Sequence, residues 1–358
     1  MNLRPEELDL VYASERIVTM VLKNKLLLLF LVFISVFVVF FWLNSSDSDQ
    51  DKLRIYTYSS FLSHYGPGPE LKKQFEQTCN CEVQFVDAGD AGLILQRLSL
   101  NPNDHVDMVI GLDYLTLNKA KNNYQWHKHK LTNIEMAQDF LRPTDYFMPY
   151  DWSPMTFIYR KSEVEKLPST IQDLTGPEFH KRFLFQDPRS STPGQQFLFW
   201  TLKEYGDQGF QVTKQLLNNI KKLSPSWSAS YGYFQQKKAS FVFSYLTSLI
   251  YHWKVDKDFN YQAINFDHPH PVQVEYFAIT QKCTQCELAE SFAKHMMTKQ
   301  AQKTLATKNY MFPAIKSVEL DEDYSKLPKL KTYSLEDYKF FQEDFSRLIK
   351  TWETLIRK

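Results

Sequence analysis

The sequence predicts an α/β fold of two lobes, preceded by a transmembrane helix. Three observations lead to this prediction: segments with strand and helix periodicity alternate from residue 52 onward, two long apolar segments are placed to cross between lobes, and one unbroken apolar run precedes them all. Hydrophobic residues form 43% of the 358 residues, which excludes a wholly disordered chain. A net charge of +1 excludes the strongly basic surface of a nucleic-acid-binding protein.

The apolar run covers residues 26–43 and contains one polar residue, Ser35. Its length is close to the ~20 residues that a helix needs to cross a bilayer. Lys23 and Lys25 precede it, so the positive-inside rule places the rest of the chain outside the cytoplasm. Because the run exceeds a signal-peptide core and ends without a small-residue cleavage motif, we expect an uncleaved anchor, with a cleaved signal peptide as the alternative.

This assignment divides the N-terminus into a cytoplasmic segment at 1–25, the anchor at 26–43 and a Ser/Asp-rich linker at 44–51. Met20 stands directly before the basic residues that flank the run. Met1 and Met20 are therefore both candidates for the first residue of the natural chain.

Alternating strand and helix segments follow the linker. The expected strands are 54–58, 82–86 and 106–110, and the expected helices are 70–78 and 91–100. Repeated βα units indicate a parallel sheet that is covered by helices.

Two segments are candidates for crossings between lobes: residues 147–159, which contain Pro149 and Pro154, and residues 272–278, which alternate in polarity. Strands at 183–186 and 241–245 lie between them with helices at 195–204, 211–222 and 249–254, and helices at 288–299 and 335–356 close the chain. We therefore expect lobe 1 from residues 52–148 and 271–358, lobe 2 from residues 149–270, and a cleft between the lobes.

Most of the ten glycines fall at junctions where an expected strand ends and a helix begins. Open α/β sheets bind ligands at the carboxyl ends of their strands. Tyr58 and Tyr65 stand at the first such junction, and Asp90 and Ala91 stand at the second. Asp90 is suited to cap the following helix, and its carboxylate is equally suited to accept a hydrogen bond from an amino group of a ligand.

The segment 186–194 places Ser191 and Thr192 directly before Pro193, a pattern typical of a helix N-terminus. Two hydroxyl groups and the exposed N–H groups of such a terminus suit an anion such as phosphate. The competing interpretation is a helix that is capped and binds nothing.

Aromatic residues gather at the remaining junctions. Trp227, Tyr245 and Tyr251 are candidates for stacking on an aromatic or cationic ligand, and Tyr310 lies in a further aromatic loop. A cation over such a ring gains about 0.5–2 kcal/mol. The competing interpretation places each ring in the hydrophobic core.

Signatures of catalysis are missing: the sequence has no Gly-x-Ser-x-Gly, His-Glu-x-x-His or phosphate-binding-loop motif. The histidine-containing segments 127–129 and 267–270 offer possible metal ligands but have the composition of loops. The Cys79-Asn80-Cys81 and Cys283-Thr284-Gln285-Cys286 segments suggest either a zinc site or disulfides. Outside the cytoplasm disulfides are favoured, and four cysteines allow three connectivities.

Taken in this order, the junction segments resemble the thiamine-binding periplasmic proteins of bacterial ABC importers, from about residue 53 to 317. The resemblance is carried by Tyr56-Thr57-Tyr58-x-Ser60-Phe61, Gly66-Pro67-Gly68-Pro69, Cys79-Asn80-Cys81-Glu82, Gly111-Leu112-Asp113, Gln186-Asp187-Pro188-Arg189-x-Ser191-Thr192-Pro193-Gly194, Trp227-Ser228-x-x-Tyr231-Gly232, Ser244-Tyr245-x-Thr247-Ser248 and Gln273-Val274-Glu275.

The resemblance implies a two-lobe, type II periplasmic-binding-protein-like fold that closes on thiamine or a thiamine phosphate and delivers it to an inner-membrane permease. It implies a receptor on the periplasmic side of the membrane, with no catalytic residue, no metal and no cofactor. The residues that it places around the ligand are Asp90 and Ala91 at the polar edge, Ser191 and Thr192 at the hydroxyethyl or phosphate end, Trp227 and Tyr245 beside the rings, and Leu246, Thr247, Ser248, Tyr251, Tyr58, Tyr65 and Tyr310 nearby.

The chain departs from the family pattern at several of these positions. Ser59 stands where the family has Asp, Tyr65 and Tyr310 stand where it has Trp, and Leu246 stands where it has Thr. These changes bring smaller rings to two positions and remove a hydroxyl group from a third. The alternatives are a receptor for another cationic ring compound, a membrane-anchored zinc-dependent enzyme, and an envelope scaffold that reuses the fold.

Overall fold

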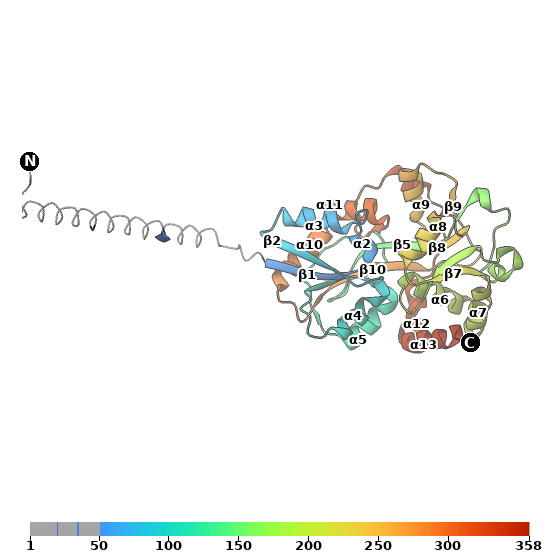
Figure 1. The fold of residues 1–358 in the computed structure, drawn as a ribbon, viewed down its shortest axis with the longest axis horizontal. Helices are drawn as coiled ribbons and strands as arrows, with labels where there is room; N and C mark the ends of the chain where they lie inside the picture. Colours follow the sequence, from blue (N-terminus) through green and yellow to red (C-terminus); the bar gives the residue numbers. More distant parts are fainter. Residues whose placement is uncertain (1–19, 21–33, 36–50, 358) are drawn as a thin grey trace, which may run out of the picture. The chain divides into compact units, whose positions relative to one another are not determined.

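The computed structural model describes Met20, residues 34–35 and residues 51–357 (Figure 1). The chain divides into two compact units, residues 1–50 and residues 51–358. The predicted anchor at 26–43 lies outside the described residues except at Ile34 and Ser35, as does almost all of the predicted cytoplasmic segment and linker. Within the part of the chain that is described, no helix is long and apolar enough to span a membrane.

The first group of strands is parallel and begins the body. Strand β1 (Asp51–Thr57) pairs in parallel with β2 (Cys81–Asp87) and β3 (Met108–Asp113), as the βα alternation predicts. Strand β10 (Val272–Thr280) runs antiparallel to β3, so a segment distant in sequence completes this half of the sheet.

Strand β5 (Met148–Arg160) connects the two halves of the sheet. Its residues 148–154 pair with β10, and its residues 155–159 pair with β8 (Phe241–Tyr245). Strand β6 (Phe183–Gln186) pairs in parallel with β8 and with β7 (Ile220–Ser224). The short strands β4 (Trp126–His127), β9 (Tyr261–Ala263) and β11 (Phe312–Pro313) pair at its sides. Strands β5 and β10 confirm the two predicted extended segments.

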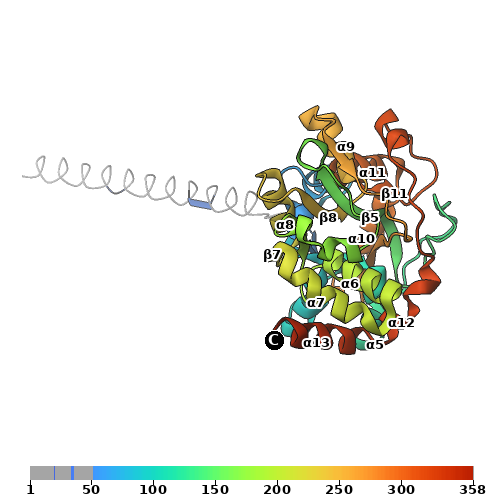
Figure 2. The same ribbon diagram turned by 90° about the vertical axis from the view of Figure 1, so that its right-hand side faces the viewer.

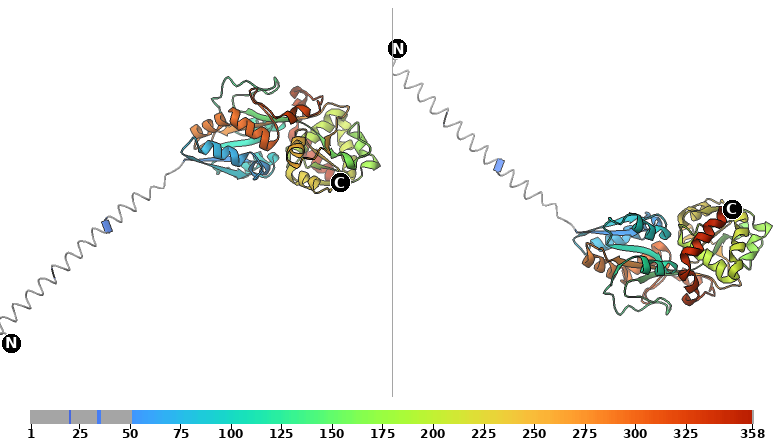
Figure 3. Two further views of the ribbon diagram at one scale, coloured as in Figure 1. Left: turned by 90° about the horizontal axis from the view of Figure 1, so that it is seen from above. Right: turned by 90° about the horizontal axis from the view of Figure 1, so that it is seen from below.

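Helices cover both faces of the first group of strands. Helices α3 (Gly68–Glu76), α10 (Cys286–Met296) and α11 (Lys299–Thr304) lie on one face, and α4 (Ile94–Leu100) and α5 (Leu117–Asn123) lie on the other (Figures 1 and 3). The short helix α2 (Ser59–Leu62) follows β1. Helix α3 begins within the Gly-Pro segment. Proline lies in its first turn, where a backbone N–H has no acceptor within the helix, so the missing N–H group of proline costs no hydrogen bond.

The second group of strands is covered in the same way. Helices α6 (Thr192–Tyr205), α7 (Gly209–Asn219), α12 (Lys339–Glu343) and α13 (Phe345–Ile356) form one layer, and α8 (Trp227–Gln235) and α9 (Ser248–Tyr251) cover the other side (Figure 2). The predicted helix 211–222 ends early, because Ile220–Ser224 extends the sheet as β7. The predicted helix 335–356 is broken, with α12 ending before α13 begins.

The buried apolar side chains form separate cores for the two groups of strands. One core draws on residues 53–150 and 272–315, and the other core clusters draw mainly on residues 155–266. The end of the chain differs from our expectation that 271–358 returns to lobe 1. Phe345, Leu348 and Trp352 recur on one face of α13 and pack into the second core, and the Trp352 Nε1–H donates to Asp187 Oδ1 at 3.0 Å.

Candidate functional site

A cavity of about 430 Å³ lies where the strands of both groups end. This volume is within the range of about 300–1,000 Å³ that is typical of small-molecule sites. Its walls come from the segments that follow β1, β2, β6, β7 and β8, with β10 and the loop 308–311. The lining residues are Tyr58, Ser60, His64, Tyr65, Asp90, Ala91, Thr192, Pro193, Trp227, Ser228, Tyr231, Gly232, Gln235, Tyr245, Ser248, Tyr251, Val255, Glu275, Lys308, Asn309, Tyr310 and Met311.

Ten of the thirteen residues predicted from the sequence line this cavity. They are Tyr58, Tyr65, Asp90, Ala91, Thr192, Trp227, Tyr245, Ser248, Tyr251 and Tyr310. They come together because the carboxyl ends of neighbouring parallel strands meet at one edge of a sheet.

The other three predicted residues do not reach the cavity. Ser191 is fully buried at the N-cap position of α6, so Thr192 is the first residue of this helix. Leu246 belongs to the hydrophobic core. Thr247 is fully buried and donates to Ser153 Oγ at 3.1 Å, which anchors the loop after β8 to strand β5.

The Trp227 ring forms an aromatic platform at the start of α8. It stacks on Tyr231 with ring centroids 4.9 Å apart and lies 5.9 Å from Tyr245. Its Nε1–H donates to Ser244 Oγ at 2.8 Å, which fixes the ring in its plane. The platform therefore presents a rigid aromatic face, with Tyr251 and Tyr310 in edge-to-face contact elsewhere in the wall.

A chain of hydrogen bonds holds Tyr231 from behind. The Tyr231 hydroxyl lies 2.9 Å from His252 Nε2, and His252 Nδ1 lies 2.7 Å from Asp256 Oδ2. Burial lowers the pKa of His252, so its neutral ring donates from Nδ1 to the carboxylate and accepts at Nε2 from the tyrosine. Tyr261 stacks on the imidazole at 3.5 Å. Tyr231 of α8 and His252 are 21 residues apart and lie on different helices, so no local pattern in the sequence indicates this chain.

Asp90 joins the two sides of the cavity. It occupies the predicted N-cap position of the turn Ala91–Leu93, and its Oδ2 accepts a hydrogen bond from the Trp227 N–H at 2.9 Å. Burial raises the pKa of Asp90 to about 6, although the Trp227 N–H group acts in the opposite direction. The carboxylate is thus partly desolvated and available to a ligand.

Two buried carboxyl groups lie on the strands that connect the halves of the sheet. Glu275 of β10 and Asp151 of β5 are register partners, and Glu275 also lines the cavity. Glu275 Oε2 accepts from the hydroxyls of Tyr58 at 2.8 Å and Tyr150 at 2.6 Å, and its Oε1 accepts from Gln273 Nε2 at 2.8 Å. Burial raises the pKa of both carboxyl groups.

Glu275 is the most consequential lining residue that sequence reasoning did not assign to the site. A signal was present, since the alternation of 272–278 places Gln273 and Glu275 on one face of a strand. Asn309 is a second such residue: its Nδ2 donates to Asp151 Oδ2 at 2.7 Å and to the Tyr58 hydroxyl at 3.1 Å. It is the last residue of the π-helical turn Leu305–Asn309, and the polar pattern at the end of so short a turn does not predict the direction of a side chain.

Helix α6 directs its N-terminus toward the cavity, where Thr192 and Pro193 form part of the wall. The partial positive charge of a helix N-terminus attracts anions. Thr192 Oγ1 accepts from Gln273 Nε2 at 3.2 Å, which links this helix to strand β10. The wall thus combines aromatic faces, two carboxyl groups and one helix terminus.

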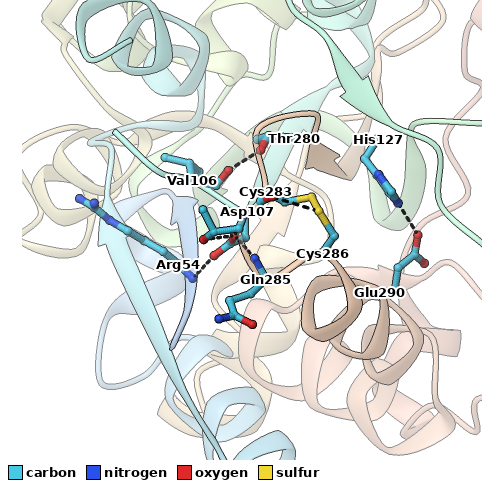
Figure 4. The surroundings of a disulfide bond; sticks show 10 residues. Arg54, Val106, Asp107, His127, Thr280, Cys283, Gln285, Cys286 and Glu290 are labelled. Carbon is cyan, nitrogen blue, oxygen red and sulfur yellow. Dashed lines mark hydrogen bonds and ion pairs between the residues drawn. A yellow bond between two sulfur atoms is a disulfide. The ribbon is translucent and has the colours of Figure 1, made fainter. Parts of the chain in front are cut away.

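The four cysteines form the disulfides Cys79–Cys81 and Cys283–Cys286, which confirms the expectation of disulfides and resolves their connectivity. Figure 4 shows the second of these. The alternative of a four-thiolate zinc site is therefore wrong for this structure. In the segment 267–270, His268 pairs with Glu204 at 2.6 Å and the buried His270 accepts from the Phe266 N–H, so these histidines are engaged within the fold.

A model of the family of bacterial extracellular solute-binding proteins matches residues 70–332. The thiamine-binding periplasmic protein of Salmonella typhimurium is 36% identical over 281 residues, covering 78% of this chain and 86% of that protein. The protein of the same name from Haemophilus influenzae is 29% identical over 316 residues, covering 86% and 93%.

Solved structures of periplasmic binding proteins share the fold of this chain. A periplasmic thiamin binding protein superposes with a TM-score of 0.79 at 32% identity, covering 86% of this chain and 96% of that one. A ferric binding protein from Campylobacter jejuni superposes with a TM-score of 0.70 at 20% identity, covering 85% and 99%. The latter similarity concerns the fold alone.

Proposed function

This chain belongs to the family of bacterial extracellular solute-binding proteins, and from that premise we propose that it captures thiamine or a thiamine phosphate in its cavity and delivers it to an ABC permease. The observation that carries the proposal is the lining of the cavity, where the Trp227 platform faces a space that also holds Asp90, Glu275 and the start of α6. The relatives and the similar structure that bear thiamine in their names support the same ligand.

The lining matches the chemistry of thiamine group by group. The ligand has a cationic thiazolium ring, an aminopyrimidine ring that donates hydrogen bonds, and a tail that ends in a hydroxyl or a phosphate. Trp227 and Tyr245 provide faces on which a cationic ring gains about 0.5–2 kcal/mol. Asp90 provides an acceptor for the amino group, and Thr192 at the N-terminus of α6 provides donors for the tail.

Capture in this proposal needs no chemical step. The first part of lobe 1, residues 52–148, contributes Tyr58 and Asp90, and lobe 2, residues 149–270, contributes Trp227 and Tyr245. A ligand that contacts both lobes stabilises the closed arrangement over the open one by the difference of its affinities for them. Strand β5 passes from the first core into the second, and the segment that leads into β10 returns to the first, so these two crossings are the natural hinge.

We also propose that residues 26–43 hold the protein to the periplasmic side of the inner membrane, since this apolar run is long enough to cross a bilayer. Tethering keeps the receptor at a high effective concentration near its permease. Fractionation of cells combined with mass spectrometry of the mature N-terminus tests this. A soluble protein that begins after residue 43 would contradict the anchor and leave thiamine capture unaffected.

The decisive experiment is a titration of the full chain with thiamine, thiamine monophosphate and thiamine diphosphate, followed by tryptophan fluorescence and calorimetry. We expect saturation with one ligand per chain at submicromolar concentration for at least one of the three. Trp227→Ala should weaken binding, whereas Trp126→Phe, a change in the first core away from the cavity, should not. The absence of any response to all three ligands would refute the proposal.

A further inference from the structure

A second group of polar side chains lies beside the Cys283–Cys286 disulfide, away from the cavity (Figure 4). Among the described residues, His127, Cys283 and Cys286 form a group whose ligand atoms all lie within 4.8 Å of one another. Cys286 is the first residue of α10, and Glu290 lies one helical turn further along the same face. Glu290 Oε1 is 3.4 Å from His127 Nε2.

Glu290 is held in place by one oxygen, and its other oxygen faces His127. Its Oε2 accepts a hydrogen bond from the Lys130 N–H at 3.0 Å. Its Oε1 is buried and receives no hydrogen bond from any residue that the structure describes. Buried carboxylate oxygens are normally hydrogen-bonded, so an oxygen that accepts no hydrogen bond and faces an imidazole at 3.4 Å is suited to share a cation with that imidazole.

The loop between the two cysteines is fixed independently of the disulfide. Asp107 Oδ1 accepts from the Thr284 N–H at 2.7 Å and from the Gln285 N–H at 2.9 Å. These bonds tie the loop to the segment that precedes β3, so the cysteines stay near His127 when the sulfur–sulfur bond is opened. Both cysteines are partly exposed, which gives a reductant and a metal ion access to them.

We propose that Cys283, Cys286, His127 and Glu290 form a binding site for zinc, or a similar thiophilic divalent cation, that exists only in the reduced protein. Two cysteines separated by two residues are a typical half of a zinc site, and an imidazole and a carboxylate complete a four-coordinate set. The disulfide excludes the metal, because its sulfurs are bonded to each other and carry no thiolate charge. The site thus holds a disulfide when the two cysteines are oxidised and a metal ion when they are reduced.

The redox step is a thiol–disulfide exchange with a dithiol donor. The donor supplies two electrons and two protons, the bond between the sulfurs of Cys283 and Cys286 breaks, and two thiols form while the donor becomes a disulfide. Zinc then displaces the two thiol protons, which pass to solvent, and binds two thiolates.

The test measures zinc bound by the full chain before and after reduction with a phosphine, which takes an oxygen atom from water and leaves as the phosphine oxide. Bound metal is quantified by elemental analysis after gel filtration and by competition with a coloured chelator. We expect one zinc per reduced chain and none per oxidised chain. His127→Ala and Glu290→Gln, which leave both cysteines intact, should weaken zinc binding by at least about 10- to 100-fold.

The other disulfide provides a matched control within the same chain. The double variant Cys79→Ser, Cys81→Ser should still bind one zinc when reduced, whereas Cys283→Ser, Cys286→Ser should bind none. Unchanged far-ultraviolet circular dichroism verifies that each variant is folded. Zinc that follows the Cys79–Cys81 pair, zinc binding unaffected by His127→Ala, or no stoichiometric zinc in the reduced protein would each overturn the proposal.

Discussion

At Asp90, the ionised carboxylate that would bind a ligand is not the protonation state that favours folding. Its carboxylate accepts from the Trp227 N–H, and burial raises its pKa from 3.8 to about 6. A carboxyl group whose pKa is raised in the folded state favours folding at low pH. Between about pH 4 and pH 6 the folded protein holds a proton that the unfolded chain has released, so this contribution to stability is lost as the pH rises through that window.

Asp90→Asn should therefore stabilise the protein at pH 7 and weaken its binding of thiamine. Loss of a hydrogen bond to a charged group costs about 1.5–3 kcal/mol, which corresponds to about a 10- to 100-fold weaker affinity. Calorimetry gives the affinity, and urea unfolding gives the stability. Asp139→Asn, a change at an exposed carboxylate, should alter neither quantity. Wild-type affinity in Asp90→Asn would remove Asp90 from the site.

The same pKa predicts how binding depends on pH. A ligand amino group bonds to the ionised carboxylate of Asp90, so affinity should be highest above about pH 6 and should fall as the pH is lowered through that value. Titrations from pH 4.5 to pH 8 measure the profile, and Asp90→Asn should flatten it. A profile that is identical in wild type and variant would assign the titration to another group.

At the scale of elements, the Asp256–His252–Tyr231 chain links the π-helical turn His252–Asp256 to α8 and its Trp227 platform. Asp256 fixes the tautomer in which Nε2 of the imidazole accepts from the tyrosine. Asp256 thus orients the Trp227 ring, on which a ligand would stack, through His252 and Tyr231.

Asp256→Asn should loosen this orientation without opening the fold. Because Asp256 is partly exposed, we expect the cost of one ordinary hydrogen bond, about 0.5–1.5 kcal/mol, or a loss of affinity of up to about tenfold. Thiamine titration measures the affinity, and near-ultraviolet circular dichroism reports on the tryptophan environment. Asp207→Asn, a change at an exposed carboxylate in the turn between α6 and α7, is the control. An unchanged tryptophan spectrum in Asp256→Asn would show that Tyr231 does not position Trp227.

The packing of helix α13 into the second core leads to a prediction for the free energy of unfolding. Trp352 is fully buried in the second core and donates to Asp187. Trp352→Ala should lower the free energy of unfolding by about 3–5 kcal/mol, the usual cost of removing a large core side chain. Thr351→Ala, on the exposed face of the same helix, should change it by less than about 0.5 kcal/mol. Urea denaturation measures both, and a small effect of Trp352→Ala would mean that α13 is not part of the core.

At the scale of the whole molecule, ligand binding should stabilise the body as one unit. Thiamine at a hundred times its dissociation constant should raise the free energy of unfolding by about 2.7 kcal/mol if it binds only the folded state. Thermal unfolding at several thiamine concentrations measures this shift, and thiochrome, which lacks the cationic thiazolium ring, is a suitable control ligand. A shift of equal size with thiochrome would argue against recognition of the cation.

The strands and most of the cavity could be predicted from the sequence because both depend on local patterns. Junction residues such as Asp90 and Trp227 follow strands, and parallel strands bring their ends together. Strand β7 was missed because Ile220-Lys221-Lys222-Leu223-Ser224 has a polar edge composition that also suits a helix end. Leu246 was misassigned because nothing in a sequence distinguishes a loop side chain that faces a cavity from one that faces the core.

The placement of α13 could not be predicted for a different reason. Its apolar stripe indicates only that it packs on something, and both cores offer an apolar surface. The choice depends on Asp187, which follows β6 and supplies the acceptor for Trp352.

Each of the two cores is completed by residues from late in the sequence, and this has a consequence for how the protein is made. The first core needs residues up to Ile315, and the second needs residues up to Trp352. A chain emerging from the export channel N-terminus first therefore cannot complete either core until nearly all of it has been translocated. Contacts this distant in sequence fold slowly. A message that is truncated before the codon for Trp352 would thus yield a chain with an unfinished second core, exposed to envelope proteases from the moment of its release.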